Sequence, residues 1–135
     1  MQNLIKPGNL VTLLALLPFS CTDDRTLPVN ERVAVDIVTS VFPPDAEVNE
    51  DIQIQLTMQA SNGCYADLTA AITEMEEDNH YQIKGSALFA SHGVCPDVIV
   101  SKDSTLTFSP ESAGDYVFQV NEAPFKVRVY TITVN

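Results

Sequence analysis

The sequence predicts an all-β protein: an antiparallel β-sandwich of about seven strands that follows a short N-terminal leader. The clearest evidence is the segment 52–59, where apolar and polar residues alternate as they do in a strand with one buried face. Further short apolar runs recur at intervals of roughly 8–15 residues, each bounded by Pro, Gly, Asn or Asp. The domain has no convincing helical period, and many short strands without helices favour two sheets packed face to face.

Residues 1–20 have the order of a signal peptide. A polar start that includes Lys6 precedes an apolar run, 10–17, and Pro18 closes this run shortly before Cys21. The run is too short for a transmembrane helix, which needs about 20 apolar residues. We therefore expect residues 1–20 to be a cleaved leader.

Leu17, Ser20 and Cys21 resemble the lipobox of the lipoprotein signal family, in which the cysteine is lipidated and becomes the first residue. Relaxed boxes of this kind resemble those of Bacteroidetes lipoproteins, and Asp23-Asp24 resembles their surface-export signal. The resemblance implies a palmitate-bearing Cys21 that anchors the protein in the outer membrane, facing the periplasm or the cell surface. Two or three acyl chains would hold it there stably. The alternative is an ordinary cleavable signal in which Cys21 is a spare thiol.

A tether, 21–32, and a single domain, 33–135, are expected after the leader. The whole chain has a net charge of −11, and loss of the leader removes Lys6, leaving six bases against 18 acids and a charge of −12. Bases this sparse exclude a nucleic-acid-binding surface and electrostatic docking on anionic lipid. Any membrane attachment should therefore come from a covalent lipid.

Cys64 and Cys95 are the two cysteines that remain beside Cys21. An even number of cysteines in an oxidising compartment predicts one disulfide. A bridge that closes a loop of about 30 residues stabilises a fold by roughly 3–4 kcal/mol in the chain-entropy model. The alternative is a pair of buried free thiols.

The individual strands follow from alternation and from the turn residues between them. The segment 65–75 fits both strand and helix spacing, and we favour a strand because the acidic stretch 76–79 reads as a hairpin tip before another alternating run. Pro43-Pro44 closes the first strand. The expected strands are 33–42, 52–59, 65–75, 81–89, 98–100, 105–108, 116–120 and 125–134.

The segments 108–110 and 113–118 look like the passage into the penultimate strand of bacterial immunoglobulin-like domains. The resemblance implies an immunoglobulin-like sandwich in which Tyr116 is the corner tyrosine whose hydroxyl returns to nearby backbone. The alternative for Tyr116 is an ordinary half-buried strand residue. Antibody-type domains differ, because this chain has no Trp and its two cysteines are too close in sequence to join the usual strands.

With Asn62-Gly63-Cys64-Tyr65 and Gly93-Val94-Cys95-Pro96 added, the pattern over 33–135 resembles small Bacteroidetes lipoproteins with an immunoglobulin-like domain. This group implies a fold and a location, and it brings no activity to carry over. The bridge is expected to tie loops at one end of the sandwich.

Sites for metals and catalysis are weakly indicated. Four acids within 74–78 are oxygen ligands of the kind that Ca²⁺ binds, but their spacing matches no known calcium loop and a solvated hairpin tip explains them. His80 and His92 are too few for zinc. Ser91, His92 and Asp97 do not form a hydrolytic triad on an extended segment, because adjacent side chains point in opposite directions. We expect no cofactor and no enzyme activity.

The function that the sequence favours is a noncatalytic binding or structural module of the cell envelope. Its loops would meet an envelope protein or a glycan, and the residues to test first are Tyr65, His92, Val94 and Pro96. One alternative is a small glycan-processing or other hydrolase whose site assembles only in three dimensions. Another is an accessory subunit that adds a strand to another protein.

Overall fold

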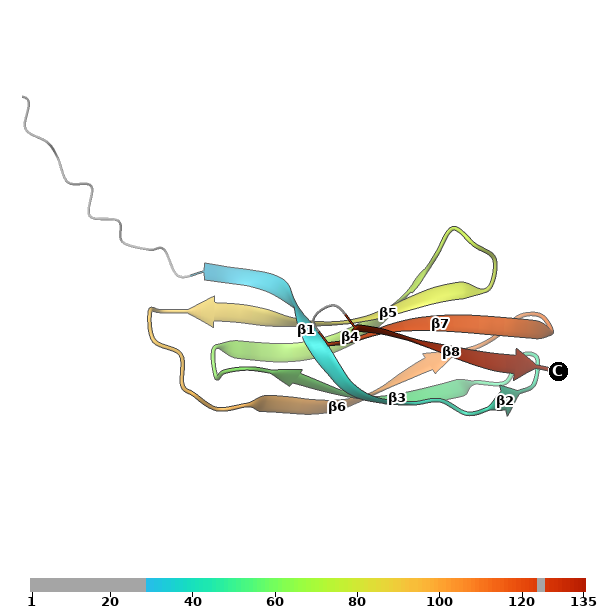
Figure 1. The fold of residues 1–135 in the computed structure, drawn as a ribbon, viewed down its shortest axis with the longest axis horizontal. Helices are drawn as coiled ribbons and strands as arrows, with labels where there is room; N and C mark the ends of the chain where they lie inside the picture. Colours follow the sequence, from blue (N-terminus) through green and yellow to red (C-terminus); the bar gives the residue numbers. More distant parts are fainter. Residues whose placement is uncertain (1–28, 124–125) are drawn as a thin grey trace, which may run out of the picture.

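The structure is a computed structural model that describes residues 29–123 and 126–135. The predicted leader, Cys21 and the tether up to residue 28 lie outside the described residues. Within them the chain forms eight strands and no helix (Figure 1). They are β1 (Val29–Val41), β2 (Asp45–Ala46), β3 (Ile52–Ala60), β4 (Tyr65–Glu74), β5 (His80–Ser91), β6 (Val100–Phe108), β7 (Gly114–Ala123) and β8 (Lys126–Val134).

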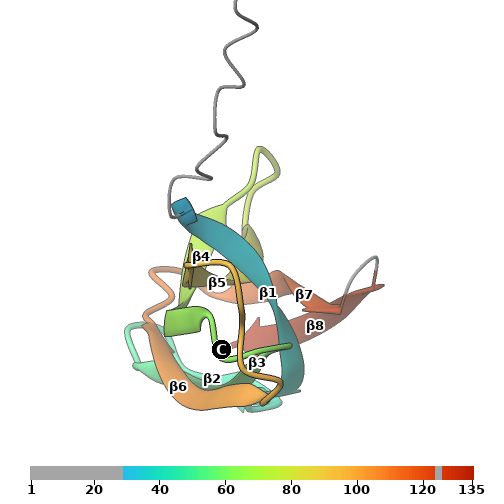
Figure 2. The same cartoon turned by 90° about the vertical axis from the view of Figure 1, so that its left-hand side faces the viewer.

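The strands form the predicted all-β, immunoglobulin-like sandwich. One layer contains β4, β5, β7 and β8, with the short β2 at its edge, and the other contains β3 and β6. Strand β1 belongs to both layers, because its first half pairs with β5 and its second half with β3. The partner changes between Val35 and Asp36, and a bulge follows between Ile37 and Thr39. Figure 2 shows β1 crossing from one layer to the other.

The sandwich is mostly antiparallel, as predicted, with two exceptions in the described part of the chain. Strand β2 pairs with β8 in parallel through two residues, and β5 pairs with β7 in parallel from His80 to Ile83. The β5–β7 pairing is made possible by the long route through β6, which lies in the opposite layer. It leaves the remainder of β5, from Gly85 to Ser91, to pair with β1.

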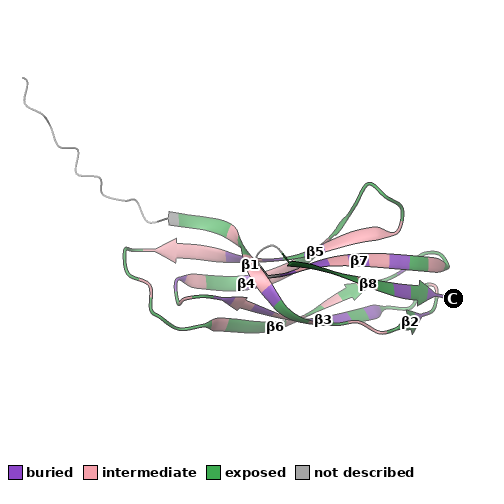
Figure 3. Cartoon of the chain, viewed as in Figure 1, coloured by how far each residue is buried: buried purple, intermediate pink, exposed green. Residues whose placement is uncertain are grey.

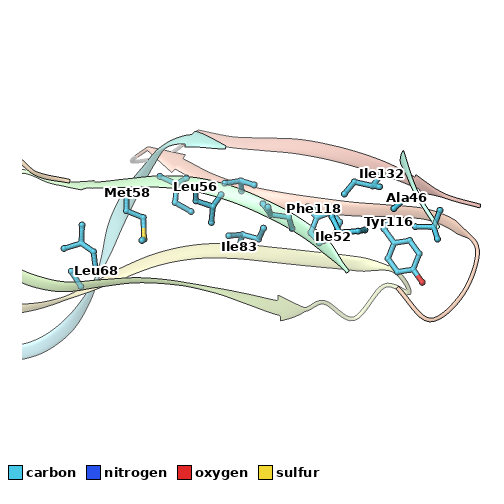
Figure 4. Close-up of a cluster of buried hydrophobic side chains, with 14 residues drawn as sticks. Ala46, Ile52, Leu56, Met58, Leu68, Ile83, Tyr116, Phe118 and Ile132 are labelled. Atoms are coloured by element: carbon cyan, nitrogen blue, oxygen red, sulfur yellow. The ribbon is translucent and has the colours of Figure 1, made fainter. Parts of the chain in front are cut away.

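The alternating face of β3 supplies one wall of the core. Ile52, Ile54, Leu56 and Met58 are all buried, whereas the intervening residues are exposed or half-buried. Figure 3 marks the buried positions along the strands. In Figure 4, Met58 and Leu68 lie at one end of this core, and Ile52 and Tyr116 lie at the other. The opposite wall consists of Leu68, Ile83, Ala87, Phe118, Val120, Ile132 and Val134.

Strand β4 confirms that the ambiguous segment after Cys64 is extended. Leu68, Ala70 and Ile72 face inwards, as strand spacing predicts. The strand is interrupted near its start by a bulge at Asp67, whose φ is 49°. Next to the bulge, Lys102 Nζ from β6 donates to the Leu68 carbonyl oxygen at 2.8 Å. The acidic stretch that follows is the predicted hairpin tip, with Asn79 at a φ of 57°.

Two predicted boundaries were wrong. Strand β1 begins at Val29, so the stretch up to Arg32, which we assigned to the tether, pairs with β5. Residues 29–32 lack the alternation of apolar and polar residues that identifies a strand, because polar side chains lie on both faces of the strand there. Val98 and Ile99 precede β6 instead of forming a strand, and the two short runs predicted between 98 and 108 are a single strand.

Tyr116 is the predicted corner tyrosine. Its side chain is 3% exposed, and its hydroxyl donates to the Ser112 carbonyl oxygen at 3.0 Å. The Ser112 backbone N–H donates back to the same hydroxyl at 3.3 Å. The tyrosine thereby fixes the loop between β6 and β7 against the end of the core.

Replacing Tyr116 by Phe should remove these hydrogen bonds while it keeps the buried ring. We expect the free energy of unfolding to fall by about 1 kcal/mol, measured by urea unfolding. Tyr65→Phe is the control, because the Tyr65 hydroxyl has no hydrogen bond within the described part of the chain. Equal stability of the two variants would contradict the structural role of the corner.

Candidate functional site

The disulfide predicted between Cys64 and Cys95 is present, with a Cα–Cα distance of 5.2 Å. It joins the turn before β4 to the loop 92–99 that follows β5. Two backbone hydrogen bonds reinforce it: Gly63 N–H donates to Pro96 at 2.8 Å, and Ala90 N–H donates to Cys64 at 3.0 Å. The bridge therefore ties two loops at one end of the sandwich, as predicted. We call this the disulfide end.

All four residues predicted to contact a partner lie at the disulfide end. Tyr65 packs against Phe89, with ring centroids 4.9 Å apart. His92, Val94 and Pro96 are exposed on the loop 92–99, and Val94 is the most exposed of them at 89%. The structure thus brings these residues to one end and leaves the loop side chains open to solvent.

The same loop carries two further exposed apolar side chains, in a segment whose sequence predicts a strand. Val98 is 55% exposed and Ile99 is 71% exposed. Ile99 lines a shallow hollow together with the exposed Val38 of β1. An apolar surface therefore extends from the loop 92–99 onto β1.

The residues considered for metal binding are dispersed. His80 and His92 lie at opposite ends of β5, and His80 Nδ1 lies 2.9 Å from the Asp78 carbonyl oxygen. The acids within 74–78 are exposed at the hairpin tip. Across residues 29–123 and 126–135, no group of three or more His, Cys, Asp or Glu side chains is arranged to hold a metal ion.

Ser91, the nucleophile considered for a triad, faces its own loop. Its Oγ accepts a hydrogen bond from Gly93 N–H at 3.2 Å. Among the described residues, neither His92 nor Asp97 forms a hydrogen bond with it.

A pocket of about 370 Å³ lies at the opposite end of the molecule, which we call the distal end. It is formed by the end of β4, the start of β5 and the loop between β6 and β7. The lining brings together two carboxylates, an amide, several hydroxyls and three aromatic rings. These groups belong to Glu74, Asn79, Tyr81, Phe108, Ser109, Glu111, Ser112 and Tyr116.

The distal pocket rests on a cluster of aromatic rings. Tyr81 stacks near Phe118, with centroids 5.4 Å apart, and it meets Phe108 edge-on at 4.7 Å. Burial raises the pKa of the Tyr81 phenol, and the nearby Glu74 carboxylate, together with Tyr116 and Glu111, raises it further. A second hollow of about 360 Å³ lies along β1, β3 and β6, and no aromatic side chain lines it.

Sequence reasoning missed a polar cluster around Glu122, which is only 6% exposed. Its carboxylate lies 3.0 Å from Arg128 Nε and 3.9 Å from Lys126 Nζ. Ser40 and Tyr130 donate to it through their hydroxyls at 3.0 and 3.1 Å. Because its partners come from β1 and β8, the cluster fastens β1 to the β7–β8 hairpin.

The edge strands bear on the predicted strand-addition role. The outer edge of β8 pairs with β2 only at Thr133 and Val134, so in the described ranges its first seven residues have no outer strand partner. Val127 and Val129 on this part are exposed. Strand addition stays a prediction.

The comparisons with known proteins identify one family. The model of the ORF11 beta-sandwich domain matches residues 54–135, more than half of the chain. The match runs from within β3 to the last residue and so includes both loops of the disulfide and the distal pocket. No curated protein and no solved structure matches the chain significantly. No helix among the described residues is long and apolar enough to cross a membrane.

In the Tyr81→Phe variant, the free energy of unfolding should decrease less steeply as the pH rises in the alkaline range. Because the folded-state pKa of Tyr81 is raised, the fold favours the protonated phenol. Its contribution is complete below the unfolded pKa of about 10 and is lost as pH rises through the raised folded pKa. Urea unfolding from about pH 9 upwards should therefore give a shallower decline for the variant. A comparison at pH 7, where the Tyr81 phenol is neutral in both the folded and the unfolded state, is the internal control. Identical slopes for the wild type and the variant at alkaline pH would contradict the prediction.

Proposed function

The chain belongs to the ORF11 beta-sandwich domain family. Beyond this family membership, we propose that it is a noncatalytic, glycan-binding module of the cell envelope. Cys21 carries the lipid that anchors it in the outer membrane, facing the periplasm or the cell surface. The observation that carries the binding role is the distal pocket, where charged, amide, hydroxyl and aromatic side chains from three segments converge.

The path of the chain supports an anchored, oriented module. Val29 at the start of β1 pairs with Ser91 at the end of β5, so the chain enters the fold at the disulfide end. Eight peptide steps separate Cys21 from Val29, a reach of at most about 29 Å. From Tyr81 to Ser91, β5 extends for about 33 Å away from that end. The distal pocket therefore faces away from an anchor at Cys21.

The lining of the distal pocket suits a sugar. Hydroxyl groups of a glycan would donate to the carboxylates of Glu74 and Glu111 and would accept from the Asn79 amide. The half-buried Tyr81 ring adds aromatic surface for the apolar face of a sugar ring. Hydrogen bonds that involve a charged partner are among the stronger ones, which makes the two glutamates the residues to test.

One observation favours hydrolysis as a second candidate function. Glu74 and Glu111 come from different segments and both raise the pKa of Tyr81, so two carboxylates flank the same pocket. Glycosidases use a pair of carboxylates in this manner, one as acid and the other as nucleophile or base. A binding experiment that also records cleavage distinguishes the two functions.

The anchor predicts palmitate incorporation that depends on Cys21. Cells that express the full chain should label the wild-type protein and not the Cys21→Ser variant, because the thiol is the acceptor of the lipid. The measurement is metabolic labelling followed by purification under denaturing conditions. Cys64→Ser is a matched cysteine control and should keep the label. Label retained by Cys21→Ser would overturn the anchor.

The distal pocket predicts binding that depends on its glutamates. With the N-acetylglucosamine tetramer as probe, Glu74→Gln and Glu111→Gln should each weaken binding about tenfold or more, because each loses a charge-assisted hydrogen bond worth about 1.5–3 kcal/mol. Calorimetry measures the affinity. Glu76→Gln changes the same charge on the exposed hairpin tip and should bind like the wild type. Equal affinities of the wild type and all three variants would contradict the assignment of the pocket as the binding site. Release of shorter sugars by the wild type would instead establish hydrolysis.

A further inference from the structure

The loop 92–99 exposes apolar side chains that no part of the described chain covers. Val94, Ile99 and Val98 are 89%, 71% and 55% exposed. The loop is held in place, because the disulfide and the hydrogen bond from Gly63 to Pro96 fix it to the turn before β4. The side chains are therefore presented by a constrained loop, and an apolar surface of this kind marks an interaction site.

This surface lies where the chain leaves the fold towards Cys21. Ser91, the residue before the loop, pairs with Val29, and the loop and the start of β1 lie at the same end in both ribbon views (Figures 1 and 2). A lipid on Cys21 would hold the bilayer within about 29 Å of Val29. The membrane that carries the anchor is thus the surface nearest to the loop.

We propose that the loop 92–99 docks on the bilayer to which Cys21 is attached, with Val94, Val98 and Ile99 entering the headgroup region. The inference rests on the lipid anchor of the proposed function and specifies what the disulfide end contacts. It assigns lipid, in place of a protein partner, to the loop residues His92, Val94 and Pro96.

Charge at the disulfide end favours an apolar contact with zwitterionic lipid. Asp97 is exposed within the loop, and the nearby Arg32 is already paired with Asp67. The mature chain carries a net charge of −12, which repels anionic headgroups. The contact should therefore resist salt, since burial of apolar side chains does not depend on ionic strength as surface ion pairs do.

Single tryptophans test this docking directly, because the chain contains no Trp. The lipidated, full-length mature protein is placed in phosphatidylcholine vesicles, with brominated acyl chains as quencher. Val94→Trp should emit at shorter wavelength and be quenched several-fold more than Val41→Trp, at low salt and at about 1 M salt, where the Debye length is about 3 Å. Val41 is the matched control, since it is an exposed valine (59%) at the other end of β1.

The possible outcomes distinguish a failure of loop docking from a failure of the lipid anchor at Cys21. Diacylated Cys21 with equal, weak quenching of both variants overturns docking and leaves the anchor intact. If the emission shifts only at high protein density and the lipid does not quench it, a second copy of the protein covers the loop. That result would also overturn docking on the bilayer. Mass spectrometry that finds an unmodified Cys21 removes the anchor, and the inference falls with it. Thermal melting of both variants confirms that they are folded.

Discussion

The pairing of β1 with both layers is the constraint on which the rest of the structure depends. Its first half hydrogen-bonds to β5 and its second half to β3, and the buried Ile37 lies just after the point where the partner changes. Because the two layers share this strand, the core between them closes along one side without a separate connection. The same strand begins at the disulfide end, where Val29 pairs with Ser91, the residue before the loop 92–99.

Much of the fold could be predicted because its signals are local. The alternation in 52–59 identifies a strand and its buried face, and the residues before Tyr116 identify the corner. The disulfide followed from counting cysteines, and its place at one end followed from the turn residues around Cys64 and Cys95. Each of these inferences needs only a short window of sequence or a compositional fact.

The rest of the fold and the distal pocket depend on contacts between residues that are far apart in the sequence. Ser40 reaches Glu122 across 82 positions, so the polar cluster has no sequence signature. The distal pocket draws on three segments that are distant in sequence, and Glu111 and Ser112 gave no signal as site residues. Val98 and Ile99 have strand propensity but lie exposed just before β6, in the loop that the disulfide ties to the turn before β4. The parallel pairing of β5 with β7 likewise arises from topology alone.

The bulge at Asp67 and the contact from Lys102 to the Leu68 carbonyl have a consequence for neighbouring molecules. Strand β4 is the outer strand of its layer, and a regular, open margin of this kind is a template for another chain. A kink in the backbone and a carbonyl already occupied by an ammonium group make that template irregular. An irregular edge of this kind disfavours hydrogen bonding between β4 and a strand of another chain, and so lowers the tendency of the protein to aggregate through this edge.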